Sequence, residues 1–362
     1  MPGTPELAAR EVKTISPSGF GLYEVCRLRW SLASAKHPHL LRSFPARELG
    51  TAYHQLIEEA SRGQVAGDES SLGVRFDEIV AELDDDLRQN WLTAVWVPMG
   101  SKVRDYGLRR GRAVTRAMSV ARTPETSRAA PTPFRGVEVF LEARSGLIRG
   151  KADSVWFDGD DLVITDEKSG RIRANDGSVQ DAYETQLLMY AAMLAESSGE
   201  WPDRLELVSA TGDRTAVAVD HARATGLLDH AIEVLTAHNE SVAGGIGADA
   251  LAAPSAEGCR FCDYRPGCAR YHEAATGRGD AEGWPSDVFG PVAEHRLLGN
   301  GGHMLLIGDP PVRVRGLSGD PDRHPDLTSD LTGSDFAGAY DVERLGGGHS
   351  FGEEPRTVIY AV

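Results

Sequence analysis

The sequence predicts two domains, a mixed α/β domain over residues 1–275 and a small all-β domain over residues 284–362. Apolar residues recur at helical spacing in much of the stretch from residue 46 to residue 118. Short β-branched or alternating runs then alternate with helical segments as far as residue 239. After Trp284 the composition changes to short apolar runs separated by Gly, Pro and Asp, which is typical of a small β domain.

The first helices follow from the spacing of apolar residues. Between Ala46 and Arg62 this spacing places His54 near the polar edge of an apolar stripe. A second helix is expected over residues 75–96 and a third over residues 101–118. The third is rich in arginine, and its basic face is suited to phosphates, although a solvated surface helix that binds nothing is the alternative. The candidate DNA-binding residues are Arg104, Arg109, Arg110, Arg112 and Arg116.

The middle of the chain predicts a sheet with helices between and after its strands. The sequence FDGDD is a turn that joins two strands as a hairpin. A helix rich in apolar residues separates the first three strands from the last two, and another helix follows them. The expected strands are residues 133–143, 147–157, 161–170, 203–210 and 214–220, and the expected helices are 181–197 and 221–239.

The C-terminal residues predict about five short strands after a linker over residues 275–287. An OB-like barrel is the most economical arrangement of such strands. A barrel of this kind offers a groove for single-stranded nucleic acid, and docking to a protein is the alternative role.

Composition and charge limit the function. A formal net charge of -16 at pH 7 argues against a protein that coats nucleic acid by bulk attraction, so any DNA contact must be local. The N-terminus lacks a basic start followed by an apolar stretch, and the chain has no run of about 18 apolar residues, so we expect a cytoplasmic protein with no membrane contact. No phosphate loop of the G-x4-G-K-[ST] type occurs, so an ATP-driven motor would have to be a partner protein.

Four cysteines suggest a metal site. Cys259, Cys262 and Cys268 form a C-x2-C-x5-C run, and Cys26 lies far upstream. In a reducing compartment this uneven spacing favours metal ligands over two disulfides. Four thiolates suit zinc or an iron-sulfur cluster, and the spacing alone leaves both open.

Two acidic strands suggest phosphodiester chemistry. Asp153 and Asp166 lie on neighbouring predicted strands and suit Mg2+ or Mn2+, which prefer oxygen ligands. Side chains alternate along a strand, so Asp166 and Lys168 share one face while Glu167 points away. Lys168 then lies beside a metal-bound water, where it orients the water and neutralises the phosphate. An exposed strand-edge ion pair is the alternative for this one motif.

Several elements in order carry a family resemblance. They are the opening SPSGFGLYEVCRLRW, His54, Asp153, the D-x-K triplet, Gln186 with Tyr190, and the cysteine run. Together, over roughly residues 14 to 272, they resemble the RecB-like branch of the PD-(D/E)XK nucleases with an iron-sulfur staple, such as AddB-type and CRISPR-associated RecB-like nucleases. The resemblance implies a restriction-endonuclease-like core with helical insertions, closed by a 4Fe-4S cluster on Cys26, Cys259, Cys262 and Cys268.

The resemblance also implies roles. His54, Asp153, Asp166 and the carbonyl of Glu167 would be ligands of a Mg2+ or Mn2+ ion, and Lys168 the catalytic lysine. Gln186 and Tyr190 would brace the site and approach DNA, and Glu138 matches a further acidic position for which Glu142 competes. The expected activity is a metal-dependent deoxyribonuclease, of exonuclease type on single strands or ends, in repair, recombination or defence, with a helicase as a possible partner. The alternative is a catalytically silent iron-sulfur or zinc scaffold that binds DNA or a helicase.

Overall fold

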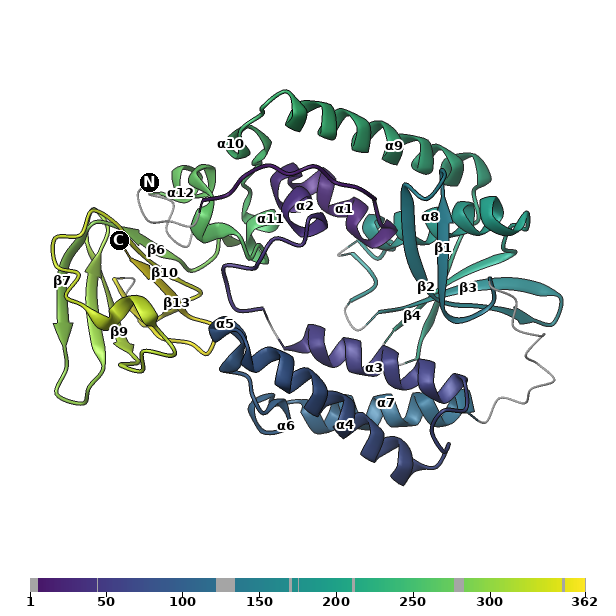
Figure 1. Ribbon diagram of the computed structural model, residues 1–362, viewed down its shortest axis with the longest axis horizontal. Coiled ribbons are helices and arrows are strands. Elements are labelled where there is room, and N and C mark those ends of the chain that lie inside the picture. Colours follow the sequence, from purple (N-terminus) through teal and green to yellow (C-terminus); the bar gives the residue numbers. More distant parts are fainter. Residues whose placement is uncertain are drawn as a thin grey trace.

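A five-stranded sheet forms the centre of the first domain, in the order β1-β2-β3-β4-β5 (Figure 1). The computed structural model describes residues 6–43, 45–121, 134–168, 171–174, 176–209, 212–276, 283–346 and 349–361. β3 and β4 are parallel and the other neighbours are antiparallel, which confirms the predicted α/β core and its hairpin. The strands are β1 (Gly136–Ala143), β2 (Ile148–Asp158), β3 (Asp161–Lys168), β4 (Arg204–Ser209) and β5 (Arg214–Val217).

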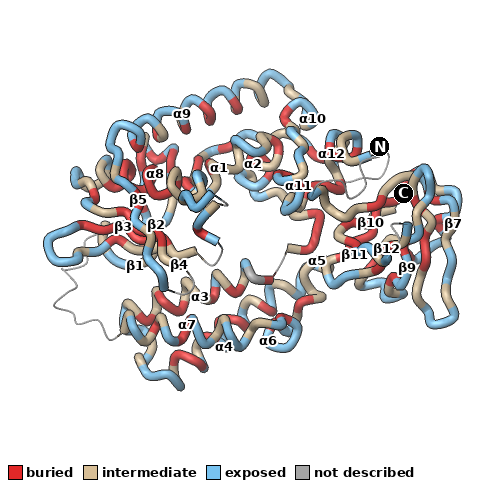
Figure 2. Tube along the Cα trace, turned by 180° about the vertical axis from the view of Figure 1, so that it is seen from behind, coloured by how far each residue is buried: buried red, intermediate tan, exposed pale blue. Residues whose placement is uncertain are grey.

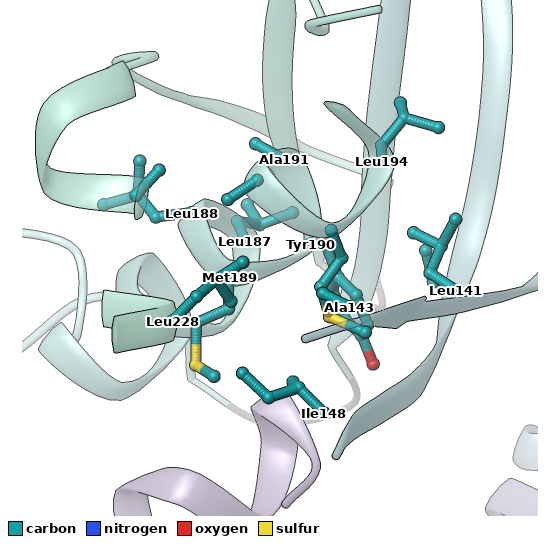
Figure 3. Packing of buried hydrophobic residues seen from close by; sticks show 14 of the residues in the cluster. Leu141, Ala143, Ile148, Leu187, Leu188, Met189, Tyr190, Ala191, Leu194 and Leu228 are labelled. Atoms are coloured by element: carbon teal, nitrogen blue, oxygen red, sulfur yellow. The ribbon is translucent and has the colours of Figure 1, made fainter. Parts of the chain in front are cut away.

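Helix α8 (Asp181–Ser198) connects the parallel strands β3 and β4, and α9 (His221–Ala243) packs on it. Every residue from Gln186 to Leu194 is buried, because α8 lies between the sheet and other helices. Figure 2 shows a continuous buried stretch in the middle of α8, whereas α9 alternates between buried and exposed positions. Figure 3 shows Leu188, Met189 and Tyr190 of α8 in one cluster with Leu141 and Ile148 of the strands. This packing fixes Gln186 relative to β3.

The N-terminal helices α1 (Pro17–Val25) and α2 (Arg27–Ser34) are separated by Cys26. Ser16 caps α1, since its hydroxyl accepts a hydrogen bond from the Gly19 N–H, and Pro17 occupies the first helical position. Cys26 has an extended backbone with φ of -163°, so its side chain lies at a corner between the two helices.

A helical unit covers the side of the molecule opposite α8 and α9 (Figure 1). It has a core of its own, built by α3, α4 and α7 around Leu56 and Phe76. The predicted helix over residues 75–96 begins earlier, because Asp68 caps α4, and it breaks before Asn90, which caps α5. The predicted helix over 101–118 is divided, because Val103 turns its side chain into the core with an extended backbone. The helices are α3 (Ala46–Ser61), α4 (Glu69–Arg88), α5 (Trp91–Ala94), α6 (Met99–Lys102) and α7 (Tyr106–Ala121).

The C-terminal domain contains two sheets around one apolar core, with strand orders β13-β10-β6 and β11-β12-β9-β8-β7. The all-β prediction is confirmed, whereas an OB-like barrel is not, because the strands pair in two sheets. Much of the predicted linker, residues 277–282, lies outside the described residues. The strands are β6 (Val288–Gly290), β7 (Val292–Leu297), β8 (His303–Ile307), β9 (Val312–Leu317), β10 (Ala337–Tyr340), β11 (Glu343–Arg344), β12 (Ser350–Gly352) and β13 (Val358–Ala361), and the 3-10 helix is η4 (Pro325–Thr328).

The C-terminal domain packs against the cysteine segment. Tyr271 shares an apolar cluster with Tyr340 and Val358 of the β domain, together with Leu41 and Leu92. The cysteine segment consists of α10 (Ala248–Leu251), α11 (Ala256–Arg260), the 3-10 helix η2 (Arg265–Gly267) and α12 (Ala269–Ala275). In the part of the chain that is described, no helix has the length and apolar content needed to cross a bilayer.

Candidate active site

Three potential metal ligands meet between α3 and the β1-β2 hairpin. His54 Nδ1 lies 2.8 Å from Glu138 Oε1 and 4.0 Å from Asp153 Oδ1. The three residues offer ligand atoms that all lie within 4.8 Å of one another. Two oxygens and one imidazole nitrogen suit a divalent cation of the Mg2+ or Mn2+ class. The predicted ligands His54 and Asp153 are therefore brought together, with Glu138 as a third.

Glu138 is the acidic residue whose assignment the sequence left open. It lies in β1 with a φ of +54°, a left-handed conformation that non-glycine residues rarely adopt. Strain of this kind collects at functional sites, and here it accompanies a carboxylate turned toward His54. The competitor Glu142 instead lies 3.6 Å from Arg149 and is exposed. Alternation of side chains along a regular strand could not predict the direction of Glu138, because the backbone is irregular at this residue.

The D-x-K triplet forms a second group with α8. Lys168 Nζ lies 2.6 Å from Asp166 Oδ2 and donates to Gln186 Oε1 at 2.8 Å. Gln186 Nε2 donates in turn to Asp166 Oδ1 at 3.0 Å, which closes a ring of three side chains. The side chain of Asp166 is only 3% exposed, so this pair is not a strand-edge ion pair. Gln186 fixes both charged groups at once.

Glu167 joins the two groups. Its backbone N–H donates to Asp153 Oδ2 at 2.6 Å, so the metal-side carboxylate is anchored to β3. Its side chain points away from Lys168, as the alternation predicted, and accepts hydrogen bonds from Tyr53 and Arg116. The Glu167 carbonyl as a metal ligand stays a prediction.

Tyr190 braces the site from within the core. Its hydroxyl donates to the Lys151 carbonyl at 2.6 Å, next to Asp153 in β2, and the residue is 3% exposed. A position so buried supports the strand and is closed to direct contact with DNA. Lys151 itself is half exposed, and its ammonium lies 3.9 Å from Glu138 Oε2.

An open groove of about 720 Å3 runs beside this site. One wall is α3 and the other is the β1-β2 hairpin. The groove carries charges of both signs, and its basic lining residues are Arg47, Arg62 and Lys151. The metal-ligating group lies on its surface, since His54, Glu138 and Asp153 are among the lining residues. A polymer substrate therefore has access to the site.

Three of the five arginines predicted to bind DNA are engaged by carboxylates. Arg109 Nε donates to Asp105 at 2.8 Å, and Arg116 binds Glu167. Arg110 makes two hydrogen bonds to Asp77 of α4, at 2.8 and 2.9 Å. Acids of α4 and β3, distant in sequence, thus neutralise part of the basic segment. Arg104 and Arg112 are exposed, and phosphate contact by these residues stays a prediction.

The four cysteines line one enclosed cavity and are all free thiols. Cys26 lies at the corner between α1 and α2, and it faces the same cavity as the three cysteines of the C-x2-C-x5-C run. Burial raises the pKa of the Cys262 thiol to about 11 and that of Cys268 to about 12. Buried thiols that converge on one cavity fit a soft metal or cluster, whose positive charge favours the thiolate. Arg265, which the sequence analysis missed, donates to the Cys259 and Cys262 carbonyls at 3.1 and 3.0 Å.

The arrangement agrees with a comparison to protein families. The model of the PD-(D/E)XK nuclease superfamily matches residues 14–269, which are most of the chain and include every site residue named above. The chain belongs to the PD-(D/E)XK nuclease superfamily. Members of this superfamily are generally metal-dependent nucleases, and membership implies DNA as the substrate. No curated protein matches the sequence significantly.

The acidic pair of this PD-(D/E)XK site should give the metal-free protein a pH-dependent stability. Burial, followed by the charge of Asp166, raises the pKa of Asp153 to about 7. The unfolded pKa is about 3.9, so the folded state holds this proton more tightly. The stabilisation is complete below the unfolded pKa and is lost as pH rises through about 7.

We expect Asp153→Asn to flatten the fall in melting temperature of chelator-treated protein between about pH 4 and pH 7. Thermal unfolding of both proteins across this range tests the expectation. Parallel profiles for the variant and the wild type would assign the pH dependence to other groups.

Proposed function

We propose that the protein is a Mg2+- or Mn2+-dependent deoxyribonuclease of the RecB-like type, acting as an exonuclease on single-stranded DNA or DNA ends. The observation that carries the proposal is the pair of side-chain groups joined by Glu167. One group offers a histidine and two carboxylates, and the other offers a buried carboxylate held against a lysine. This is a complete set of groups for hydrolysis of a phosphodiester, which argues against a catalytically silent scaffold.

The residues fit a divalent cation. Asp153 and Asp166 are close enough for the charge of one to raise the pKa of the other, and a dication relieves that repulsion. His54, Asp153 and Asp166 would hold the ion, with Glu138 as a further oxygen donor. A bound Mg2+ or Mn2+ supplies a Lewis acid and an activated water.

Lys168 and Gln186 would act on the attacking water and on the charge of the phosphate. Lys168 donates a hydrogen bond to Gln186, which itself donates to Asp166, and these bonds keep the ammonium beside the carboxylate. From there Lys168 orients the attacking water and neutralises charge that develops on the phosphate oxygens. Burial of the Asp166–Lys168 pair strengthens this electrostatic effect relative to water.

We further propose that the four cysteines hold a 4Fe-4S cluster that staples the N-terminal helices to the cysteine segment. The shared cavity and the four free thiols, which are buried or partly buried, support a site with a full sulfur shell. The resemblance to iron-sulfur nucleases favours the cluster over zinc.

Cys26→Ser is expected to lower the iron content, the absorbance at about 400 nm and the melting temperature together. Only three thiolates remain to hold the cluster, and the corner between α1 and α2 is no longer tied to the cysteine segment. The measurements are iron analysis, the visible spectrum and thermal unfolding of anaerobically purified protein. A variant as stable as the wild type but without colour would show that the cluster has no structural role. Zinc in place of iron in the wild type would refute the cluster.

The nuclease proposal is tested with anaerobically purified protein and end-labelled linear single-stranded, linear duplex and circular DNA, with and without Mn2+. We expect metal-dependent degradation of linear single strands, with circular DNA spared. Cleavage of circles would make the enzyme an endonuclease. DNA binding without cleavage under any metal condition would favour the scaffold.

A further inference from the structure

The side chain of Glu167 lies between two helices of the helical unit. Arg116 of α7 donates to Glu167 Oε1 from Nε at 2.9 Å and from Nη2 at 2.7 Å. The hydroxyl of Tyr53, in α3, donates to the other oxygen, Oε2. The Glu167 side chain is 15% exposed, so its charge depends on these two partners for compensation. One carboxylate on β3 thus holds both α3 and α7.

The same residue belongs to the catalytic strand. Its neighbours in the sequence are Asp166 and Lys168, and its N–H donates to Asp153 Oδ2 at 2.6 Å. A shift of Glu167 therefore displaces both proposed metal carboxylates. Its side chain and its backbone connect the helical unit to the two acidic strands.

The contact with Tyr53 also sets the position of His54. The two residues are adjacent in α3, and their rings meet edge to face with centroids 5.4 Å apart. The helices α3 and α7 share an apolar core, so a restraint on α7 is transmitted to α3. His54 can stay 2.8 Å from Glu138 only while α3 keeps its place against the hairpin.

We propose that Arg116 is a positioning residue of the metal site, which holds His54 against Glu138 and Asp153 through its ion pair with Glu167. The inference rests on the proposed metal-dependent function. It gives Arg116 a role different from the phosphate contact that the basic segment predicted, because its guanidinium is turned to a carboxylate inside the protein.

The test is the affinity for Mn2+ in the absence of DNA, measured from the signal of free Mn2+ in electron paramagnetic resonance. Arg116→Met should weaken this affinity by about 10-fold to 100-fold, as loss of a residue that orients a ligand does. Arg112→Met is the matched control, since Arg112 is exposed one turn earlier on α7. We expect it to leave Mn2+ affinity unchanged and to weaken DNA binding, with a salt slope smaller by about 1.

Two milder variants keep the inference testable if Arg116→Met does not fold. Tyr53→Phe removes one hydroxyl and should weaken Mn2+ binding by a smaller factor, while Arg116→Lys keeps the charge and should retain part of the affinity. Equal Mn2+ affinity in all three variants and the wild type would overturn this inference alone. A wild-type protein that binds no Mn2+ would overturn the proposed function as well.

Discussion

Lys168→Met is expected to lower kcat for metal-dependent DNA cleavage by about 10²- to 10⁴-fold, the range for loss of a group that moves a proton or stabilises charge in the transition state. The ammonium is 2.6 Å from Asp166 and is held there by Gln186, so its charge occupies a fixed position in the site. The variant should fold. Burial already raises the pKa of Asp166, so this carboxyl can take up a proton when the lysine charge is removed.

The measurement is single-turnover cleavage of end-labelled DNA, with circular dichroism as the check on folding. Lys13→Met is the control, because Lys13 is exposed and lies outside the site. KM for DNA should change little in Lys168→Met, since the groove along α3 is untouched. Cleavage within a few-fold of the wild type would remove Lys168 from the mechanism.

The strands and helices around the site were predictable because local patterns determine them. The alternating runs before and after FDGDD gave β2 and β3, and the apolar run from Leu187 to Leu194 gave the buried α8. The breaks at Gln89 and Val103 were missed, because a capping asparagine and one buried valine overrode helical spacing. The two-sheet pairing of the C-terminal domain depends on long-range strand contacts that short runs do not encode.

The sequence was sufficient to predict which residues form the site and their order along the chain. His54, Asp153 and the D-x-K triplet occur in separate segments, and the fold brings them together. Their partners could not be predicted. Glu138 faces His54 only because its backbone is irregular, and Arg116 appeared to be part of a basic surface because its partner lies 51 residues away.

The role of Arg265 was not predicted from the sequence. It follows Cys262 in the cysteine run, yet its guanidinium is fully buried and pairs with Asp287 at 2.7 Å and Asp341 at 2.6 Å. Both aspartates belong to the C-terminal domain. Two more bonds reach the carbonyls of Cys259 and Cys262, so one side chain links the cysteine site to the β domain. The C-terminal domain is therefore a structural neighbour of the cysteine site.

Arg265→Leu should lower the free energy of unfolding by about 3–5 kcal/mol, the cost of leaving a buried partner charge uncompensated. Asp287 is 1% exposed and would keep the Tyr271 hydroxyl and the Asp341 N–H as donors. Urea unfolding of anaerobically purified protein measures the loss, and iron content should fall with it because the cysteine loop is released.

Arg270→Leu is the matched control, since Arg270 is 52% exposed and pairs with Glu273 on the same helix. An exposed pair of this kind contributes less than about 1 kcal/mol, so the control should unfold near the wild-type midpoint. Adding Asp287→Asn to Arg265→Leu removes the stranded charge and should recover part of the stability. If Arg265→Leu matched the control instead, the two domains would be joined by their apolar contacts, and the buried ion pairs would add nothing to the stability of the cysteine site.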